Sequence, residues 1–161
     1  MNLLCWNTRG MGSLTVFNKL QRLVRCHSPK LVFLSETKLW GSKTANLRFG
    51  LGFDSCFHVD HEGSSGSLVL LWNNEWIISV KSFSKHHIDA LITNDRGSRW
   101  RFTRVYGHCK TIERIHTWEV IRHLNSLFDL PWQLGGDFNE ILGLSEKKGG
   151  SASYYSSMFY F

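Results

Sequence analysis

Residues 130–140 read Leu130-Pro131-Trp132-Gln133-Leu134-Gly135-Gly136-Asp137-Phe138-Asn139-Glu140. The apolar first half of this stretch predicts a β-strand, and the two glycines let the backbone turn tightly or approach a ligand closely. A carboxylate, Asp137, and a carboxamide, Asn139, therefore stand at the end of a strand. Without further context, an Asp and an Asn in such a place more commonly form a simple Asx-type turn.

Two earlier segments end in the same way. The apolar run Leu3–Trp6 leads into Asn7, and the run Leu31–Ser35 leads into Glu36. In open α/β architectures, ligands bind at the carboxyl ends of buried strands. We therefore expect three buried strands to bring Asn7, Glu36, Asp137 and Asn139 into one cleft. Oxygen donors of this kind suit a hard divalent cation and a phosphate.

The rest of the chain predicts an α/β protein. Ser13 is a good N-cap for a helix over residues 14–27, and Ser28-Pro29 ends it. A strand, this helix and a second strand predict a parallel pair with a crossover. The other expected strands are 55–59, 67–72, 76–83, 88–93 and 99–106, with a helical turn over 42–50 and a second helix over 111–129.

Length and composition bound the class of protein. The chain has 161 residues, of which 42% are hydrophobic and 20% charged. These values are typical of one globular domain rather than a disordered chain. Residues 1–50 hold eight Lys and Arg against one acidic residue, Glu36, so their net charge is +7, whereas the whole chain carries +6. A basic segment favours a polyanionic partner but says nothing about reaction type.

The four cysteines, Cys5, Cys26, Cys56 and Cys109, are too far apart for a zinc ribbon or a redox dithiol, so we expect buried free thiols. The segment 58–62 contains two histidines and two acids, but in neither a zinc nor a zincin spacing. The start of the chain has no basic leader, and no run is long enough to span a membrane. These features predict an intracellular protein of the nucleus or cytoplasm.

Four stretches together resemble the amino-terminal part of the exonuclease-endonuclease-phosphatase family, in particular the endonucleases of plant non-LTR retrotransposons. They are Trp6-Asn7-Thr8-Arg9-Gly10, Leu34-Ser35-Glu36-Thr37-Lys38, Val105-Tyr106-Gly107-His108 and Gly135-Gly136-Asp137-Phe138-Asn139-Glu140. They occur in the order found in the family, across residues 1–150. The resemblance implies a sandwich of two β-sheets flanked by helices, only partly present in this chain.

The resemblance also implies Mg²⁺-dependent hydrolysis of phosphodiesters in DNA, with Mn²⁺ as an alternative metal and no small-molecule cofactor. Glu36 would bind the metal, with Asn7 supporting the metal site, and Asp137 would orient the attacking water. Asn139 and Tyr106 would hydrogen-bond the scissile phosphate. Arg9 and Lys38 would touch the nucleic acid weakly, although scattered surface charge explains these two equally well.

One part of the family pattern does not occur in this sequence. The family places a Ser-Asp-His segment near the end of the domain, whereas residues 151–161 form a divergent tail of serines and aromatic residues. We therefore expect weak activity from this chain alone, and self-association through an uncovered sheet. The alternatives are a non-catalytic remnant that binds nucleic acid through its basic first third, and a small-molecule phosphatase of the same superfamily.

Overall fold

The first helix of the computed structural model shows how local sequence sets the boundaries of an element. The structure describes residues 2–60 and 67–141. Helix α1 (Leu14–His27) begins where the Ser13 hydroxyl accepts a hydrogen bond from the Val16 amide, 3.3 Å away. It ends at Ser28, whose φ of 43° leaves the helical region just before Pro29. The predicted helix is confirmed.

The first sheet is built from residues 3–72 and has the strand order β1-β2-β4-β3. Strand β1 (Leu3–Asn7) runs parallel to β2 (Leu31–Ser35), with α1 as the crossover, as predicted. Strands β3 (Ser55–Val59) and β4 (Leu68–Trp72) complete the sheet in antiparallel pairs. Helix α2 (Ser42–Leu51) connects β2 to β3.

The second sheet is built from the next part of the chain and has the order β5-β6-β7-β8. Strands β5 (Ile77–Ser84), β6 (His87–Thr93) and β7 (Arg99–Tyr106) form an antiparallel meander. A 3₁₀ turn, η1 (Thr111–Glu113), and helix α3 (Arg114–Asn125) then cross to β8 (Trp132–Asp137), which is parallel to β7. The predicted second helix thus ends earlier than expected, and the final strand runs through both glycines to Asp137.

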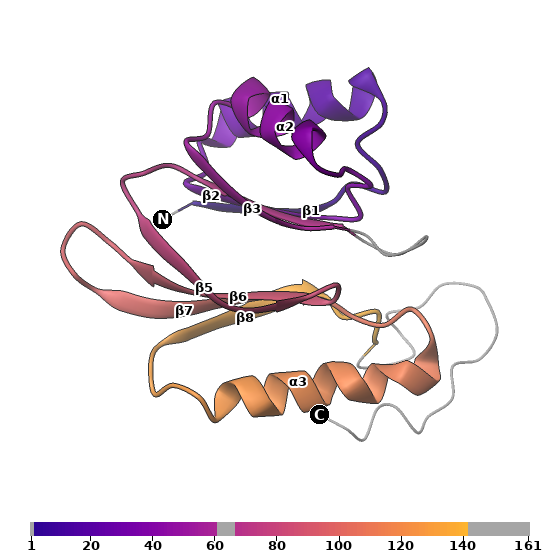
Figure 1. The fold of residues 1–161 in the computed structure, drawn as a ribbon, viewed down its shortest axis with the longest axis vertical. Helices are drawn as coiled ribbons and strands as arrows, with labels where there is room; N and C mark the ends of the chain where they lie inside the picture. Colours follow the sequence, from indigo (N-terminus) through magenta and orange to yellow (C-terminus); the bar gives the residue numbers. More distant parts are fainter. Residues whose placement is uncertain (1, 61–66, 142–161) are drawn as a thin grey trace.

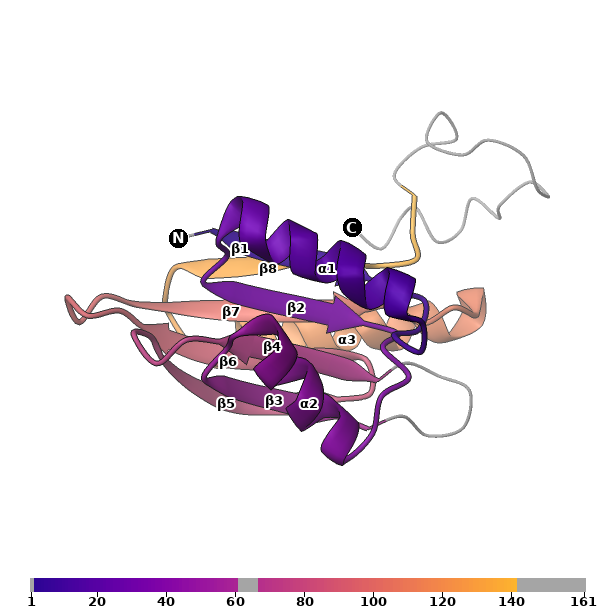
Figure 2. The same cartoon turned by 90° about the horizontal axis from the view of Figure 1, so that it is seen from above.

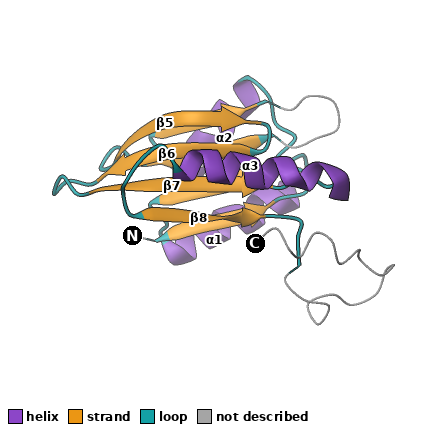
Figure 3. Cartoon of the chain, turned by 90° about the horizontal axis from the view of Figure 1, so that it is seen from below, coloured by secondary structure: helices purple, strands orange, loops and turns teal. Residues whose placement is uncertain are grey.

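The two sheets stack face to face, with α1 and α2 on the outer side of the first and α3 on the outer side of the second (Figures 1, 2 and 3). Between them lies a core of large apolar side chains: Leu31, Phe33, Leu68, Leu70, Ile88, Ile92, Phe102 and Tyr106. The predicted two-sheet sandwich with flanking helices is confirmed. The expectation that an inner sheet face lies uncovered is wrong, because residues 2–60 and 67–141 place four strands in each sheet and the two inner faces cover each other.

On one side of the sandwich the edge strands are β1 and β8, and on the other side they are β3 and β5. The stacking places β1 opposite β8 and β3 opposite β5, since Asn7 contacts Asp137 and the Phe57 ring contacts the Phe83 ring. Within residues 2–60 and 67–141, β1 pairs only with β2, and β8 only with β7. Both edge strands are therefore half-buried, so the expectation of three buried strands holds only for β2.

The cysteines are free, but they are not buried as expected. Cys5, Cys26 and Cys109 are exposed, and Cys56 is half-buried. Cys5 is exposed because it lies on the edge strand β1. Cys26 lies in the last turn of α1, and Cys109 lies in the loop that follows β7.

A buried ion pair joins β6 and β7 beneath α3. Arg101 is 1% exposed and donates two hydrogen bonds, of 2.7 and 2.9 Å, to the carboxylate of Asp89, which is fully buried. The Thr103 hydroxyl also donates to Asp89, and Arg101 donates to the carbonyl oxygen of Leu124 in α3. The pair therefore fixes α3 to the sheet that carries Tyr106 and Asp137.

A buried histidine on β6 predicts acid sensitivity. The ring nitrogens of His87 lie 2.8 Å from the hydroxyls of Ser82 and Ser84, and burial lowers the pKa of this imidazole. In the unfolded chain the pKa of this imidazole is about 6.5, so near and below that pH the unfolded state binds a proton more readily than the folded state does. We expect the free energy of unfolding to fall as the pH drops from about 7 to 5, measured by urea titration. A His87→Gln variant should show a shallower pH dependence, and an unchanged one would contradict this account.

No helix in residues 2–60 and 67–141 is long and apolar enough to cross a membrane. His61 and the tail 151–161 lie outside the described residues.

Candidate active site

The first two predicted site residues are neighbours because their strands are parallel neighbours. Asn7 is the last residue of β1, and Glu36 directly follows β2. The register pairs Asn7 with Ser35, so both strands present their side chains at the same end. The Asn7 amide donates a hydrogen bond of 2.7 Å to Glu36 Oε1.

The second sheet brings the other residues to the same place from across the sandwich. Tyr106 and Asp137 end β7 and β8 and are partners in the parallel register. The Tyr106 hydroxyl donates to Glu36 Oε1 over 2.9 Å, and the Asn7 amide lies 3.4 Å from Asp137 Oδ2. The site therefore lies where two facing sheets end, rather than along the edge of a single open sheet as the strand pattern suggested.

Asn139 joins the site through the loop after β8. Its backbone amide donates to Asp137 Oδ1 over 3.1 Å, which is the Asx-type turn expected for such a sequence. Its side-chain amide donates to the carbonyl oxygen of Gly107, 2.7 Å away. The turn and the site are thus compatible: the turn is what holds Asn139 beside Tyr106 and Asp137.

Strained backbone gathers around this site. Five non-glycine residues in the described chain have positive φ, and four of them lie in the site loops: Arg9, Glu36, Lys38 and Asn139, with φ between 49° and 54°. Such conformations cost about 1–3 kcal/mol each and persist where the surroundings impose them. The loops after β1, β2 and β8 are therefore held in place rather than relaxed.

The glycines of the stretch 135–140 allow β8 to lie close against β7. Gly136 has a φ of 149°, and a side chain there would overlap the carbonyl oxygen of Val105. A side chain at Gly107 would overlap the backbone of Phe138. These close approaches place Asp137 and Asn139 next to Tyr106, so the glycines serve the site through packing rather than through direct contact with a ligand.

The environment of Tyr106 keeps its hydroxyl protonated. Burial, followed by hydrogen bonds to the Cys109 thiol and the Glu36 carboxylate, raises the pKa of this phenol above its usual value. At neutral pH Tyr106 is therefore a neutral donor. Tyr106 is also a core residue, because its ring packs between the two sheets.

The two predicted nucleic-acid contacts lie in the same loops but point to solvent. Both Arg9 and Lys38 are exposed. The Arg9 backbone amide donates to Asn7 Oδ1 over 3.1 Å, so Arg9 supports the site through its backbone. No ion pair of either side chain occurs within residues 2–60 and 67–141. Both charges are thus free to meet an anionic ligand.

The donor set fits a hard divalent cation. Glu36 and Asp137 are the two carboxylates of the site, and one amide, that of Asn7, bridges them. No group of three or more His, Cys, Asp or Glu in the described part of the chain could hold a metal on its own. Mg²⁺ usually takes one or two carboxylates completed by substrate phosphate and water, whereas zinc and other softer metals prefer nitrogen and sulfur. Glu36 would therefore hold the cation, with Asn7 as support, and Asp137 lies on the other side of the Asn7 amide.

Three supporting groups were not predicted from the sequence. Cys109 contacts the Tyr106 hydroxyl at 3.3 Å, and the Thr8 hydroxyl donates to the carbonyl oxygens of Ser35 and Glu36. Arg104, two residues before Tyr106 on β7, is 7% exposed, and its Nε has no hydrogen-bond partner among the described residues. Strand alternation places Arg104 on the inward face with Phe102 and Tyr106, which was the one available signal.

Comparison with solved structures relates this fold to proteins of known architecture. TDP2 of D. rerio, solved with a single-strand DNA product, superimposes with a TM-score of 0.64 at 17% identity, over 86% of this chain and 60% of that one. A Neisseria 3′ phosphatase, NExo, solved with a product DNA hairpin, gives 0.60 at 16%, over 86% and 58%. The endonuclease domain of TRAS1, a telomere-specific non-LTR retrotransposon, gives 0.60 at 14%, over 85% and 59%.

The sequence itself matches no family model and no curated protein. The chain spans about three-fifths of the length of the solved structures that it resembles. At identities of 14–17%, these similarities show a shared fold and no more. This chain has the fold of the exonuclease-endonuclease-phosphatase proteins.

Proposed function

We propose that this chain is the metal- and phosphate-binding part of a phosphodiesterase that nicks DNA. The observation that carries the proposal is the Asn7 amide between two carboxylates that come from opposite sheets, with the Tyr106 hydroxyl on the same Glu36 oxygen. Groups that are 130 residues apart in sequence converge there with carboxylate oxygens and an amide. The DNA-bound neighbours of the same fold support DNA as the substrate.

Each residue then has a chemical task. A bound Mg²⁺ would polarise the phosphate and offset its charge. Asp137 would orient the attacking water and accept its proton, since its Oδ1 is already aligned by the Asn139 amide. Tyr106 and Asn139, both neutral, would hydrogen-bond phosphate oxygens without repelling the substrate. We propose Mg²⁺ as the metal, Mn²⁺ as a substitute, and a retrotransposon-type endonuclease as the lineage.

Nicking of supercoiled plasmid in the presence of Mg²⁺ tests this function. We propose slow nicking by the 161-residue chain, because each missing acid-base group costs about 10²- to 10⁴-fold. The wild-type chain should nick faster than Glu36→Ala and Asp137→Ala, and chelation should abolish the difference. Equal nicking by all three proteins would reveal a contaminating nuclease and contradict the proposal.

A binding function is the second candidate, favoured by the net charge of +7 in residues 1–50. In this case DNA would be retained without cleavage. Retention should weaken steeply between 50 and 200 mM salt, because phosphate contacts release counterions, with a loss of about 10³-fold or more for six contacts. Salt-sensitive retention combined with no metal-dependent nicking would favour this candidate over the enzyme.

We also propose that the chain self-associates through the edge strands of its two sheets, β1, β3, β5 and β8, rather than through an uncovered face. These edges carry unpaired backbone groups in the described structure, which is the usual template for adding strands. Sedimentation velocity should show dimers or larger species that grow with protein concentration. A monodisperse monomer with a sharp unfolding transition would contradict this.

A further inference from the structure

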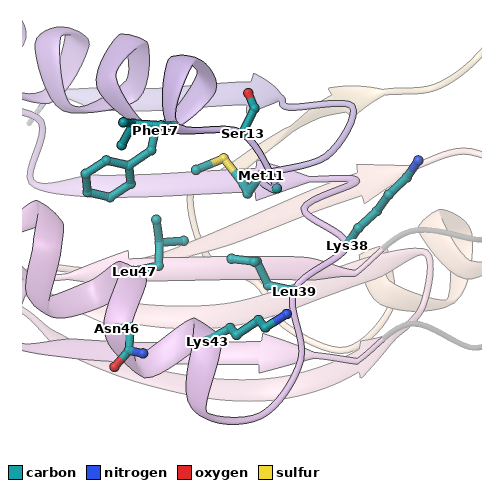
Figure 4. A pocket seen from close by; sticks show the side chains of 10 residues that line it. Met11, Ser13, Phe17, Lys38, Leu39, Lys43, Asn46 and Leu47 are labelled. Carbon is teal, nitrogen blue, oxygen red and sulfur yellow. The ribbon is translucent and has the colours of Figure 1, made fainter.

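A cavity lies beside the candidate active site, on the helical side of the first sheet. Its volume is about 440 Å³, it is open to solvent, and it is bordered by the loop after β1, the start of α1, the loop after β2 and one side of α2 (Figure 4). This volume is within the range of about 300–1,000 Å³ that holds small organic ligands in proteins. The cavity is therefore large enough for one nucleotide.

The cavity and the site share the same two loops. Gly10 donates its amide to the carbonyl oxygen of Glu36 over 2.7 Å, and Met11 donates to Thr37 over 2.8 Å. Leu39 lines the cavity only three residues after Glu36, which is at most about 11 Å of extended chain. A polymer bound at Glu36 could thus reach the cavity without leaving the protein surface.

The chemistry of the cavity changes from its floor to its rim. Met11, Phe17, Leu39 and Leu47 converge on the floor, and Met11 and Leu47 are only 7% and 5% exposed (Figure 4). Lys43 stands on the rim, and Lys38 extends away from the floor. The side chain of Lys38 passes close to Gly10, since a Cβ atom on that glycine would lie 3.5 Å from it. An apolar floor with a cationic rim suits a ligand that has a flat apolar part and an anionic part.

The charge at the rim has no internal counterpart. Neither lysine forms an ion pair within residues 2–60 and 67–141, and neither α1 nor α2 has an acidic residue in its first turn. Lys43 instead lies over the ring of Trp40, 5.8 Å from its centre, and Trp40 is 60% exposed. An exposed aromatic ring beside free cations is a common surface for single-stranded nucleic acid.

We propose that this cavity receives one unpaired nucleotide of the DNA strand bound at the active site. The base would lie on the floor formed by Met11, Phe17 and Leu47, with its phosphate at the rim beside Lys43. The nucleotide must be unpaired, because a base within a duplex does not expose its faces. The proposal rests on the proposed function for its choice of DNA, and it adds a subsite that reads an unstacked base next to the cleaved bond.

The test uses the methyl group of Met11 as a reporter. In protein labelled with ¹³C-methyl methionine and kept free of metal with EDTA, dAMP should shift the Met11 resonance in a saturable way, because a base stacked nearby imposes a ring current. Deoxyribose 5-phosphate, which has the sugar and phosphate but no base, should leave the resonance in place. A short single-stranded oligonucleotide should reproduce the dAMP shift, and a blunt duplex should not.

Two exposed lysines provide the matched variants. Lys43→Glu should weaken dAMP binding about tenfold, or 1.4 kcal/mol, whereas Lys81→Glu, with the same charge change on the β5 edge, should not. Equal weakening by both variants, or an equal shift with deoxyribose 5-phosphate, would overturn the proposal. So would a Met11 shift caused by an acidic, leucine-containing peptide but not by dAMP.

The outcome of this titration is independent of whether the proposed function is right. It contains no metal and measures no cleavage, so an absence of nicking leaves its outcome unchanged. Normal nicking with an unresponsive Met11 would remove the subsite and keep the enzyme. A responsive Met11 with nicking that does not depend on Glu36 would do the reverse.

Discussion

Asp89→Ala is expected to lower the free energy of unfolding by about 3–5 kcal/mol. The substitution leaves the guanidinium of Arg101, which is 1% exposed, without its carboxylate partner. A buried charge that has lost its partner cannot recover hydration, and Thr103 loses its acceptor as well. Since stabilities of single domains are about 5–15 kcal/mol, the variant should be close to unfolding at room temperature. Urea titration monitored by tryptophan fluorescence measures the loss.

Two controls separate this effect from generic damage. Glu75→Ala breaks the exposed pair with Lys30, 2.6 Å long, and should cost less than about 1 kcal/mol. The double variant Asp89→Leu with Arg101→Met removes both charges and should be more stable than Asp89→Ala alone. A loss below 1 kcal/mol for Asp89→Ala would mean that the pair does not hold α3 and the second sheet together.

Asp137→Asn is expected to lower metal-dependent nicking by about 10²- to 10⁴-fold. Asparagine has the same shape and can still accept the hydrogen bond from the Asn139 amide, so the loop should keep its conformation. What the variant removes is the charge that accepts a proton from water. Single-turnover assays with protein in excess over plasmid extend the measurable range for a slow nuclease.

The control for this prediction is Asp129→Asn, an exposed carboxylate before β8 at the opposite end from the site. It should nick like the wild-type chain. Nicking by Asp137→Asn within a factor of three of wild type would exclude Asp137 as the group that activates water. The activation of water would then belong to another residue.

Local signals in the sequence predicted the elements well. Ser13 and Pro29 bracket α1, because the ends of a helix are decided by a few neighbouring residues. The boundaries of β8 were less accurate. Glycine usually weakens a strand, yet here Gly135 and Gly136 allow β8 to continue close against β7.

The arrangement of the sheets and the buried charges could not be predicted in this way. On β7, Trp100, Phe102 and Tyr106 pack in the core between the sheets, but the other face is also buried, beneath α3, where Arg101 pairs with Asp89. Which strands face each other across a sandwich depends on contacts far apart in sequence. The convergence of the site residues was predictable only at the level of strand ends, and their division between two sheets was not.

The binding of Mn²⁺, followed by the loss of its free-ion EPR signal, is a direct test of the metal site, because it needs neither DNA nor turnover. Glu36→Gln keeps the shape of the side chain and removes the charge that would hold the cation, and Glu75→Gln is the matched surface control. We expect the wild-type chain and Glu75→Gln to bind Mn²⁺ at one site, and Glu36→Gln to bind at least about tenfold more weakly, a change of 1.4 kcal/mol. Equal binding by all three proteins would show that Glu36 does not hold the cation.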